Sequence, residues 1–234
     1  MNNINSNQYG LALHTSSPEL GLALSNFADD SRCQSWNLGR DISTHLHQYL
    51  AEFIQPQTWA DLAFIAVAIG PGSFTGTRIG VVTARTLAQQ LDIPLFAIST
   101  LAAVAWEKKQ HSAEKINPET IQNRAMPTAG SAYALEMPAQ RGQLFVAIYQ
   151  VSPENSGLTQ VLADTVMTPE TWQQTLDSWT SPYELINIPA GDGLGGSVSS
   201  LLELAYLDWQ QGKRSHWSDV LPYYGQHPVA EKAN

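Results

Sequence analysis

The sequence predicts an α/β protein made of two subdomains, each a mixed β-sheet with flanking helices. Strand and helix patterns alternate through the first hundred or so residues, which is typical of a sheet covered by helices. A polar connection, residues 108–129, interrupts this alternation, and the second half begins again with strands followed by helices. A chain of 234 residues, 43% of them hydrophobic, is long enough to form one large core or two smaller ones.

The first subdomain is predicted over residues 9–107, behind a polar stretch, residues 1–8, that we expect to be disordered. Leu46, Leu50 and Phe53 recur at helical spacing and predict an amphipathic helix. An uninterrupted apolar run after residue 61 predicts a buried strand. The expected elements are strands 9–15 and 21–25, a helix 43–54, a strand 62–69, a helix 79–91, a strand 95–98 and a helix from 100 to about 109.

The second subdomain is predicted over residues 130–234, with a carboxy-terminal tail that we expect to fold back on the first. Pro118 and Pro127 lie in the polar connection and favour a boundary or a surface insertion there. The expected elements are strands 133–137 and 143–149, a helix 169–179, a strand 185–189 and a helix 198–209.

A glycine-rich run between a strand and a helix is the most informative feature of the chain. Such a turn is the usual geometry for holding an anion on backbone N–H groups. However, a phosphate loop needs a Lys where Thr77 and Arg78 stand, and a dinucleotide fingerprint needs a Gly where Thr75 stands. The spacing alone is compatible with two interpretations, a tight strand-to-helix connection without a ligand and a turn that binds one. The residues of this signature loop are Gly70, Pro71, Gly72, Ser73, Phe74, Thr75, Gly76 and Arg78.

The run GPGSFTGTRIG resembles the signature of the TsaB family, bacterial proteins of tRNA threonylcarbamoyladenosine synthesis. The resemblance covers about residues 9–105, with further matching segments at Arg141–Tyr149 and Gly191–Gly193. It implies a fold of the actin, sugar-kinase and Hsp70 type that has lost its own catalytic site.

The resemblance also implies which groups are missing. Actin-like ATPases hold phosphates between two hairpin turns with a carboxylate in each, but His14 stands at the first position and Pro138 at the second. Neither offers the oxygen ligands that a hard cation needs. We therefore expect no catalytic residue, no intrinsic cofactor and no metal, with ATP and metal in a TsaD partner. His14 is expected to be hydrogen-bonded and partly buried. Asp192 is a weak candidate for a nucleotide ribose, with a plain turn as the alternative.

Small residues recur every four positions in the helix after the signature loop, and such a row lets two helices approach closely. In TsaB relatives this helix and the preceding one form an interface for self-association or for docking TsaD. The resemblance thus implies a partner interface, with packing against the sheet as the alternative. The expected interface residues are Leu46, Leu50, Phe53, Gly80, Ala84 and Ala88.

Charge and cysteine content limit the partners and the compartment. The net charge is −9 with twelve Lys and Arg, which argues against the chain gripping tRNA by itself. The lone cysteine, Cys33, suits a reducing cytosol and is expected to be a small core residue. We find no signal-peptide pattern and no apolar run of about eighteen residues, so we expect a cytoplasmic protein without a membrane partner.

Two hypotheses follow. In the first, the chain is a non-catalytic scaffold that binds TsaD, with the ATPase TsaE joining, for modification of the adenosine next to the anticodon in ANN-decoding tRNAs. Here tRNA would be bound only within the complex, and a homodimer through the same helices is a further option. In the second, it is a stand-alone actin-like ATPase or small-molecule kinase. His14 and Pro138 favour the first.

Overall fold

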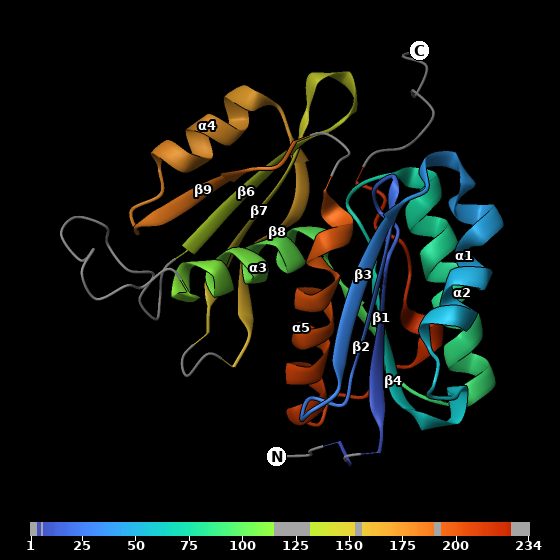
Figure 1. Ribbon diagram of the computed structural model, residues 1–234. Helices are drawn as coiled ribbons and strands as arrows, with labels where there is room; N and C mark the ends of the chain where they lie inside the picture. The colour runs from blue at the N-terminus through green and yellow to red at the C-terminus, as the bar shows by residue number, and fades with distance from the viewer. Residues whose placement is uncertain (1–3, 6, 115–131, 153–155, 190–192, 226–234) are drawn as a thin grey trace.

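The computed structural model describes residues 4–5, 7–114, 132–152, 156–189 and 193–225. The first half contains β1 (Tyr9–His14), β2 (Glu19–Ser25), β3 (Ser31–Asn37), α1 (Ile42–Phe53), β4 (Leu62–Ala68), α2 (Phe74–Leu91), β5 (Leu95–Ile98) and α3 (Thr100–Glu114). The second half contains β6 (Ala132–Pro138), β7 (Leu144–Val151), β8 (Leu158–Met167), α4 (Pro169–Asp177), β9 (Tyr183–Asn187) and α5 (Val198–Gln210). Figure 1 shows the two halves side by side.

Each half is built on a mixed sheet with the same strand order. The first sheet runs β3-β2-β1-β4-β5 and the second β8-β7-β6-β9. In both, the first three strands of the order are antiparallel and the fourth is parallel to the third. The topology is therefore duplicated, and the predicted fold class, two mixed sheets with flanking helices, is confirmed.

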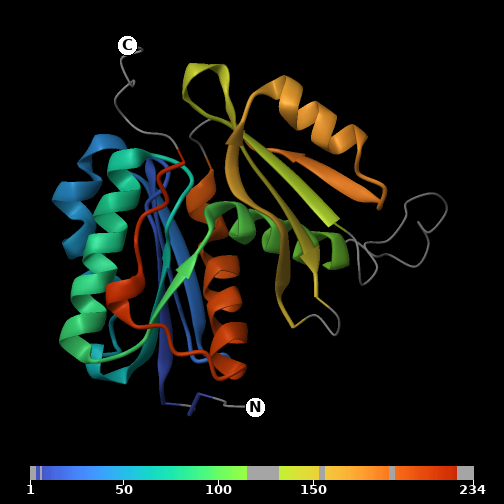
Figure 2. The same ribbon diagram turned by 180° about the vertical axis from the view of Figure 1, so that it is seen from behind.

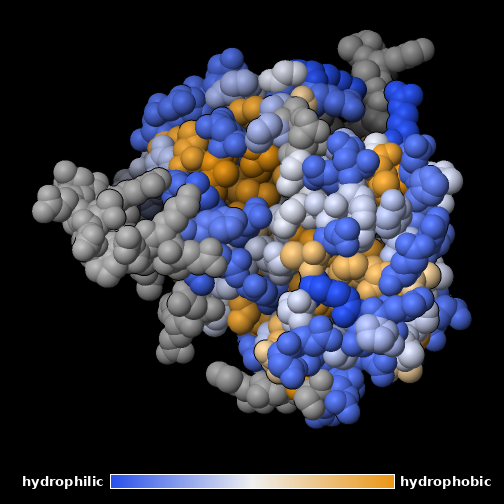
Figure 3. Space-filling view, in the orientation of Figure 1, coloured by the Kyte–Doolittle hydropathy of each residue, from blue (hydrophilic) through white to orange (hydrophobic). Residues whose placement is uncertain are grey.

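The second sheet has no described counterpart of β5, so β9 is an edge strand. Tyr183 and Leu185 on this strand are exposed. Hydrophobic side chains gather on this face over the second sheet (Figure 3).

Two strands were not predicted from the sequence, and both lie at the edge of their sheet with residues that are mostly exposed or half-buried. β3 reads SRCQSWN and lies at the edge of the first sheet, where its pairing with β2 over seven residues holds it in place. Cys33 points out of this edge strand and is exposed, so the expectation of a core cysteine was wrong. β8 is likewise mostly exposed or half-buried, and it pairs with β7.

Capping residues determine where two of the helices begin. The predicted helix 79–91 begins five residues earlier, because Ser73 caps it by accepting a hydrogen bond from the Gly76 N–H at 3.2 Å. It ends at Asp92, which adopts a left-handed conformation. α4 starts with Thr168 as the cap and Pro169 in the first turn, a favourable arrangement.

The first sheet is covered on both faces. α1 and α2 pack on one face over side chains such as Leu11 and Leu13, and α5 packs on the other over Ala12 and Ala66. α5 follows the second sheet in the chain but contacts β1, β2, β4 and β5. Figures 1 and 2 show it lying beside the first sheet and next to α3. The two halves therefore do not correspond to two continuous stretches of the chain, because α5 comes after the second sheet but packs on the first.

The segment after α5 also runs along the first half. The Leu95 N–H donates to the Ser215 carbonyl at 3.1 Å, and the Tyr223 N–H donates to the Ile69 carbonyl at 2.7 Å. This segment thereby reaches the end of β4, where the signature loop starts. Among the described residues, no helix is long and apolar enough to cross a membrane.

Candidate functional site

The signature loop leaves β4 and packs directly on the turn between β1 and β2. The Ser73 N–H donates to the Ser16 carbonyl at 2.7 Å, and the Thr77 hydroxyl donates to the Ser16 hydroxyl at 3.1 Å. The Thr15 hydroxyl donates to the Gly76 carbonyl at 2.8 Å. Thr15, Ser16 and Thr77 are all buried. The loop and the turn therefore form one closed hydrogen-bonded unit.

Two glycines of the loop allow this contact. A Cβ atom on Gly72 would lie 2.2 Å from the Ser16 carbonyl oxygen, and one on Gly76 would lie 2.1 Å from the Thr15 carbonyl oxygen. Both obstacles are backbone atoms, which cannot rotate away. The glycine spacing that resembles a phosphate loop thus serves backbone-to-backbone packing.

His14 ends β1 just before this turn, and it differs from the expectation of a partly buried, hydrogen-bonded residue. Its side chain is 0% exposed, and neither ring nitrogen has a hydrogen-bond partner among the described residues. It lies inside the sheet, paired with Gly21 of β2. Burial lowers the pKa of His14 to about 4, so the ring is neutral near pH 7.

The hairpin between β6 and β7 occupies the matching place in the second half. Pro138 ends β6 as His14 ends β1, and it is exposed. A cavity of about 410 Å³ separates this hairpin from the signature loop. Tyr223 and Tyr224 also line it, with the Tyr224 ring 5.4 Å from that of Phe74. Its described lining residues include no acid and no basic side chain.

The late loop around residue 193 is tied to the first half by an acid that the sequence analysis missed. Glu19 on β2 accepts hydrogen bonds from the Gly193 N–H at 3.1 Å and the Gly195 N–H at 2.9 Å. These backbone donors are thus occupied by a side chain of the same protein. Asp192, the ribose candidate, lies outside the described residues.

The row of small residues in α2 is buried, which corrects the prediction of an open partner surface. Ala84 and Ala88 are 0% exposed, and a Cβ atom on Gly80 would lie 2.2 Å from the Thr15 hydroxyl oxygen. Leu46 and Leu50 belong to the same core, and Phe53 is half-buried against it. These residues pack the helices on the sheet, the alternative that the spacing had left open.

A different stripe of α2 faces outward. Phe74, Arg78 and Val82 are spaced four residues apart, and all three are exposed, Val82 by 61%. The Arg78 guanidinium lies 5.3 Å from the centre of the Phe74 ring. We call these three residues the outer stripe. The spacing of these three residues can be read from the sequence, but the sequence analysis assigned the partner interface to the row of small residues on the same helix.

Among the described residues, no group of three or more His, Cys, Asp or Glu side chains could hold a metal ion. His45 and His47 lie on α1, half-buried and exposed respectively. The geometry around the signature loop therefore offers packing and an exposed helix face, within the part of the chain that the structure describes.

The sequence of this chain is similar to those of known proteins over the segment that contains the signature loop. A family model, TsaD: tRNA N6-adenosine threonylcarbamoyltransferase, matches residues 41–121, which contain the signature loop. The tRNA threonylcarbamoyladenosine biosynthesis protein TsaB of Bacillus subtilis (strain 168) is 36% identical over 122 residues, 52% of this chain and 44% of that protein. The protein of the same name from Escherichia coli (strain K12) is 43% identical over 51 residues, 20% of this chain and 22% of that protein. Over about half of its length, the chain is similar to the TsaB proteins. The alignments span less than half the length of these relatives.

Solved structures agree on the fold. YeaZ from Pseudomonas aeruginosa superposes with a TM-score of 0.70 at 20% identity, covering 93% of this chain and 99% of that one. At this identity the likeness establishes the fold, in both halves.

Replacing Gly76 with Ala should destabilise the protein by about 3 kcal/mol, because the added methyl group meets the Thr15 carbonyl. Helix propensity alone would favour the change, since Gly76 lies in the first turn of α2. Urea unfolding followed by circular dichroism measures the difference. Gly196→Ala is the matched control, because a Cβ atom there meets nothing within 4 Å. Equal stability of the two variants would contradict the packing role.

His14 should make the protein sensitive to mild acid. Its folded-state pKa of about 4 lies below the ordinary value of 6.5, so the unfolded chain binds more protons between these values. The free energy of unfolding is therefore unaffected by the titration of His14 above pH 6.5 and falls as the pH drops towards 4. The total loss is about 3 kcal/mol. Unfolding free energies measured across this range should fall more steeply for the native protein than for His14→Leu, and parallel curves would contradict the assignment.

Proposed function

We propose that this chain is a non-catalytic scaffold subunit in the synthesis of threonylcarbamoyladenosine in tRNA. It acts by binding a TsaD-type catalytic subunit, with a TsaE-type ATPase joining the complex. Its homologues carry names from this biosynthesis, and the TsaD family model matches the segment around the signature loop. The modified base is the adenosine next to the anticodon in ANN-decoding tRNAs.

The observation that carries the proposal is the closed contact between the signature loop and the turn of Thr15 and Ser16. An anion-binding loop needs free N–H groups, but the Ser73 N–H bonds to Ser16 and the Gly76 N–H bonds to the Ser73 hydroxyl. The positions that hold carboxylates in actin-like ATPases carry a neutral buried His14 and an exposed Pro138. This arrangement favours a binding role over phosphoryl transfer, with ATP and metal supplied by the partner.

The outer stripe is the proposed contact surface. Aromatic residues and arginine dominate the energetic centres of protein interfaces, and Phe74 and Arg78 lie together at the start of α2. Val82 and Tyr224 extend the exposed apolar area, and the Tyr224 ring lies tilted beside that of Phe74. A homodimer through this stripe would compete with the TsaD-type partner for it.

The negative net charge of the chain supports a role in which this subunit does not bind tRNA by itself. With twelve Lys and Arg against 21 Asp and Glu, the chain lacks the positive surface that neutralises phosphates. We propose that tRNA is held by the assembled complex, in the cytoplasm, and that this subunit needs no membrane contact.

Val82→Arg should abolish binding of the host's TsaD-type protein and leave the fold intact, because the side chain already faces solvent. Isothermal titration of the two purified proteins measures the affinity, and we expect a loss of at least roughly tenfold. Gln174→Arg on α4 is the matched control, since it adds the same charge at an exposed helix position of the second half.

Unchanged affinity of Val82→Arg would rule out the outer stripe as the contact surface. The scaffold role itself is tested separately with the native chain. Tight magnesium-dependent ATP binding with turnover by the isolated protein would instead favour a stand-alone actin-like ATPase or small-molecule kinase.

A further inference from the structure

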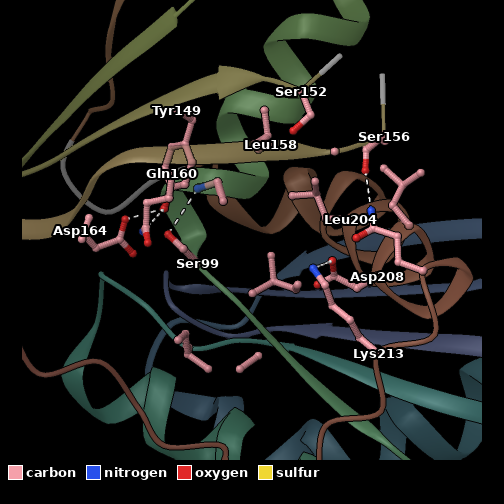
Figure 4. A pocket seen from close by; sticks show the side chains of 18 of the residues that line it. Ser99, Tyr149, Ser152, Ser156, Leu158, Gln160, Asp164, Leu204, Asp208 and Lys213 are labelled. Carbon is pink, nitrogen blue, oxygen red and sulfur yellow. Dashed lines mark hydrogen bonds and ion pairs between the residues drawn. The ribbon is translucent and has the colours of Figure 1, made fainter. Parts of the chain in front are cut away.

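A second cavity lies between the two halves, and no residue of the signature loop lines it. Its volume is about 610 Å³, within the range of small-molecule sites. Figure 4 shows side chains from several elements pointing into it. Its walls come from the end of β5 and the start of α3, from β7 and β8, from α5, and from Tyr223 of the final segment.

One side of this cavity carries a half-buried acid, Asp164 of β8. The Tyr149 hydroxyl donates to its carboxylate at 2.7 Å, and the Gln160 amide donates to the Tyr149 hydroxyl at 3.2 Å. The Tyr223 hydroxyl donates to the Asp164 carbonyl at 2.8 Å. The bond from Tyr149 orients the carboxylate, and the bond from Tyr223 holds the backbone of Asp164.

Asp164 has no cationic partner among the described residues, where the ion pairs within 4.0 Å involve other acids. Burial raises the pKa of Asp164, and hydrogen bonds from Ser99 and Tyr149 oppose that rise. A carboxylate accepts more hydrogen bonds than Tyr149 and Ser99 supply. It therefore has free acceptor capacity toward the cavity and an uncompensated charge, which a bound cation would balance.

The rest of the cavity is suited to an aliphatic chain. Leu158, Leu204 and Leu207 line it, as does a second acid, Asp208 of α5. Asp208 lies on the opposite side of the cavity in Figure 4, where its carboxylate contacts the Lys213 ammonium at 2.5 Å. This second acid is thus already charge-balanced, and Asp164 is the acid left to recognise a ligand.

We propose that this cavity binds a small aliphatic amine, with its ammonium group on the Asp164 carboxylate and its methylene chain against the three leucines. The Tyr149 hydroxyl oxygen accepts one bond, from Gln160, and can accept a second from an ammonium proton. An anionic ligand is disfavoured, because it would face the half-buried carboxylate of Asp164. The assignment is independent of the proposed TsaD binding, because no residue of α2 lines this cavity.

The test uses the full-length protein near neutral pH, with butylamine as the probe and butan-1-ol as its neutral counterpart. Amide chemical shifts followed by NMR should change around Gln160, Ala163 and Leu207 on adding butylamine, with saturation at millimolar concentration. Butan-1-ol should bind at least roughly tenfold more weakly, because it lacks the charge.

Asp164→Asn should weaken butylamine binding by roughly tenfold or more. Asp177→Asn, at an exposed acid of α4, should leave binding unchanged and controls for general attraction to an acidic protein. If Asp164→Asn does not fold, Leu158→Trp narrows the cavity and retains the acid, and it should also abolish binding. Saturable shifts that are equal for butylamine and butan-1-ol, shifts confined to surface acids, or no shifts at all would each overturn the proposal.

Discussion

The contact of the signature loop with the turn between β1 and β2 determines how the first half is arranged. It joins residues about sixty positions apart in the chain through hydrogen bonds at Ser16, Ser73 and Thr77. The same contact fixes where α2 starts, because Ser73 is both a partner of the turn and the cap of the helix. The direction of α2 then sets which of its residues face the sheet and which form the outer stripe.

The two halves are held together by elements that cross between them. α5 follows the second sheet but fills one face of the first, and Glu19 of the first sheet binds the loop before α5. The final segment adds a third connection, from Ile69 through Tyr223 to Asp164. Two cavities remain between the halves, one between the signature loop and the β6–β7 hairpin and a separate one at Asp164.

The sequence was sufficient for the fold class and for most helices and buried strands, because apolar periodicity reports burial directly. It missed β3, whose polar residues become a strand only through pairing with β2. It also misassigned Ala84 and Ala88, since a row of small residues looks the same whether it packs on a sheet or on a partner. For His14, the sequence shows the residue type. It does not show that the ring has no hydrogen-bond partner among the described residues, because this depends on how the strands pack. The glycines were identified, but their reason lies in Thr15 and Ser16, which no local pattern connects to them.

Hydrogen exchange of the Ser73 amide tests most directly whether the loop is used for packing. If the loop and the turn form one unit, this proton should exchange only through global unfolding, at a rate comparable to amides in β1 and β4. Added ATP and magnesium should not change that rate. Rapid exchange of the Ser73 amide that slows when nucleotide is added would contradict the account, because it would mean that the loop is open and receives a phosphate.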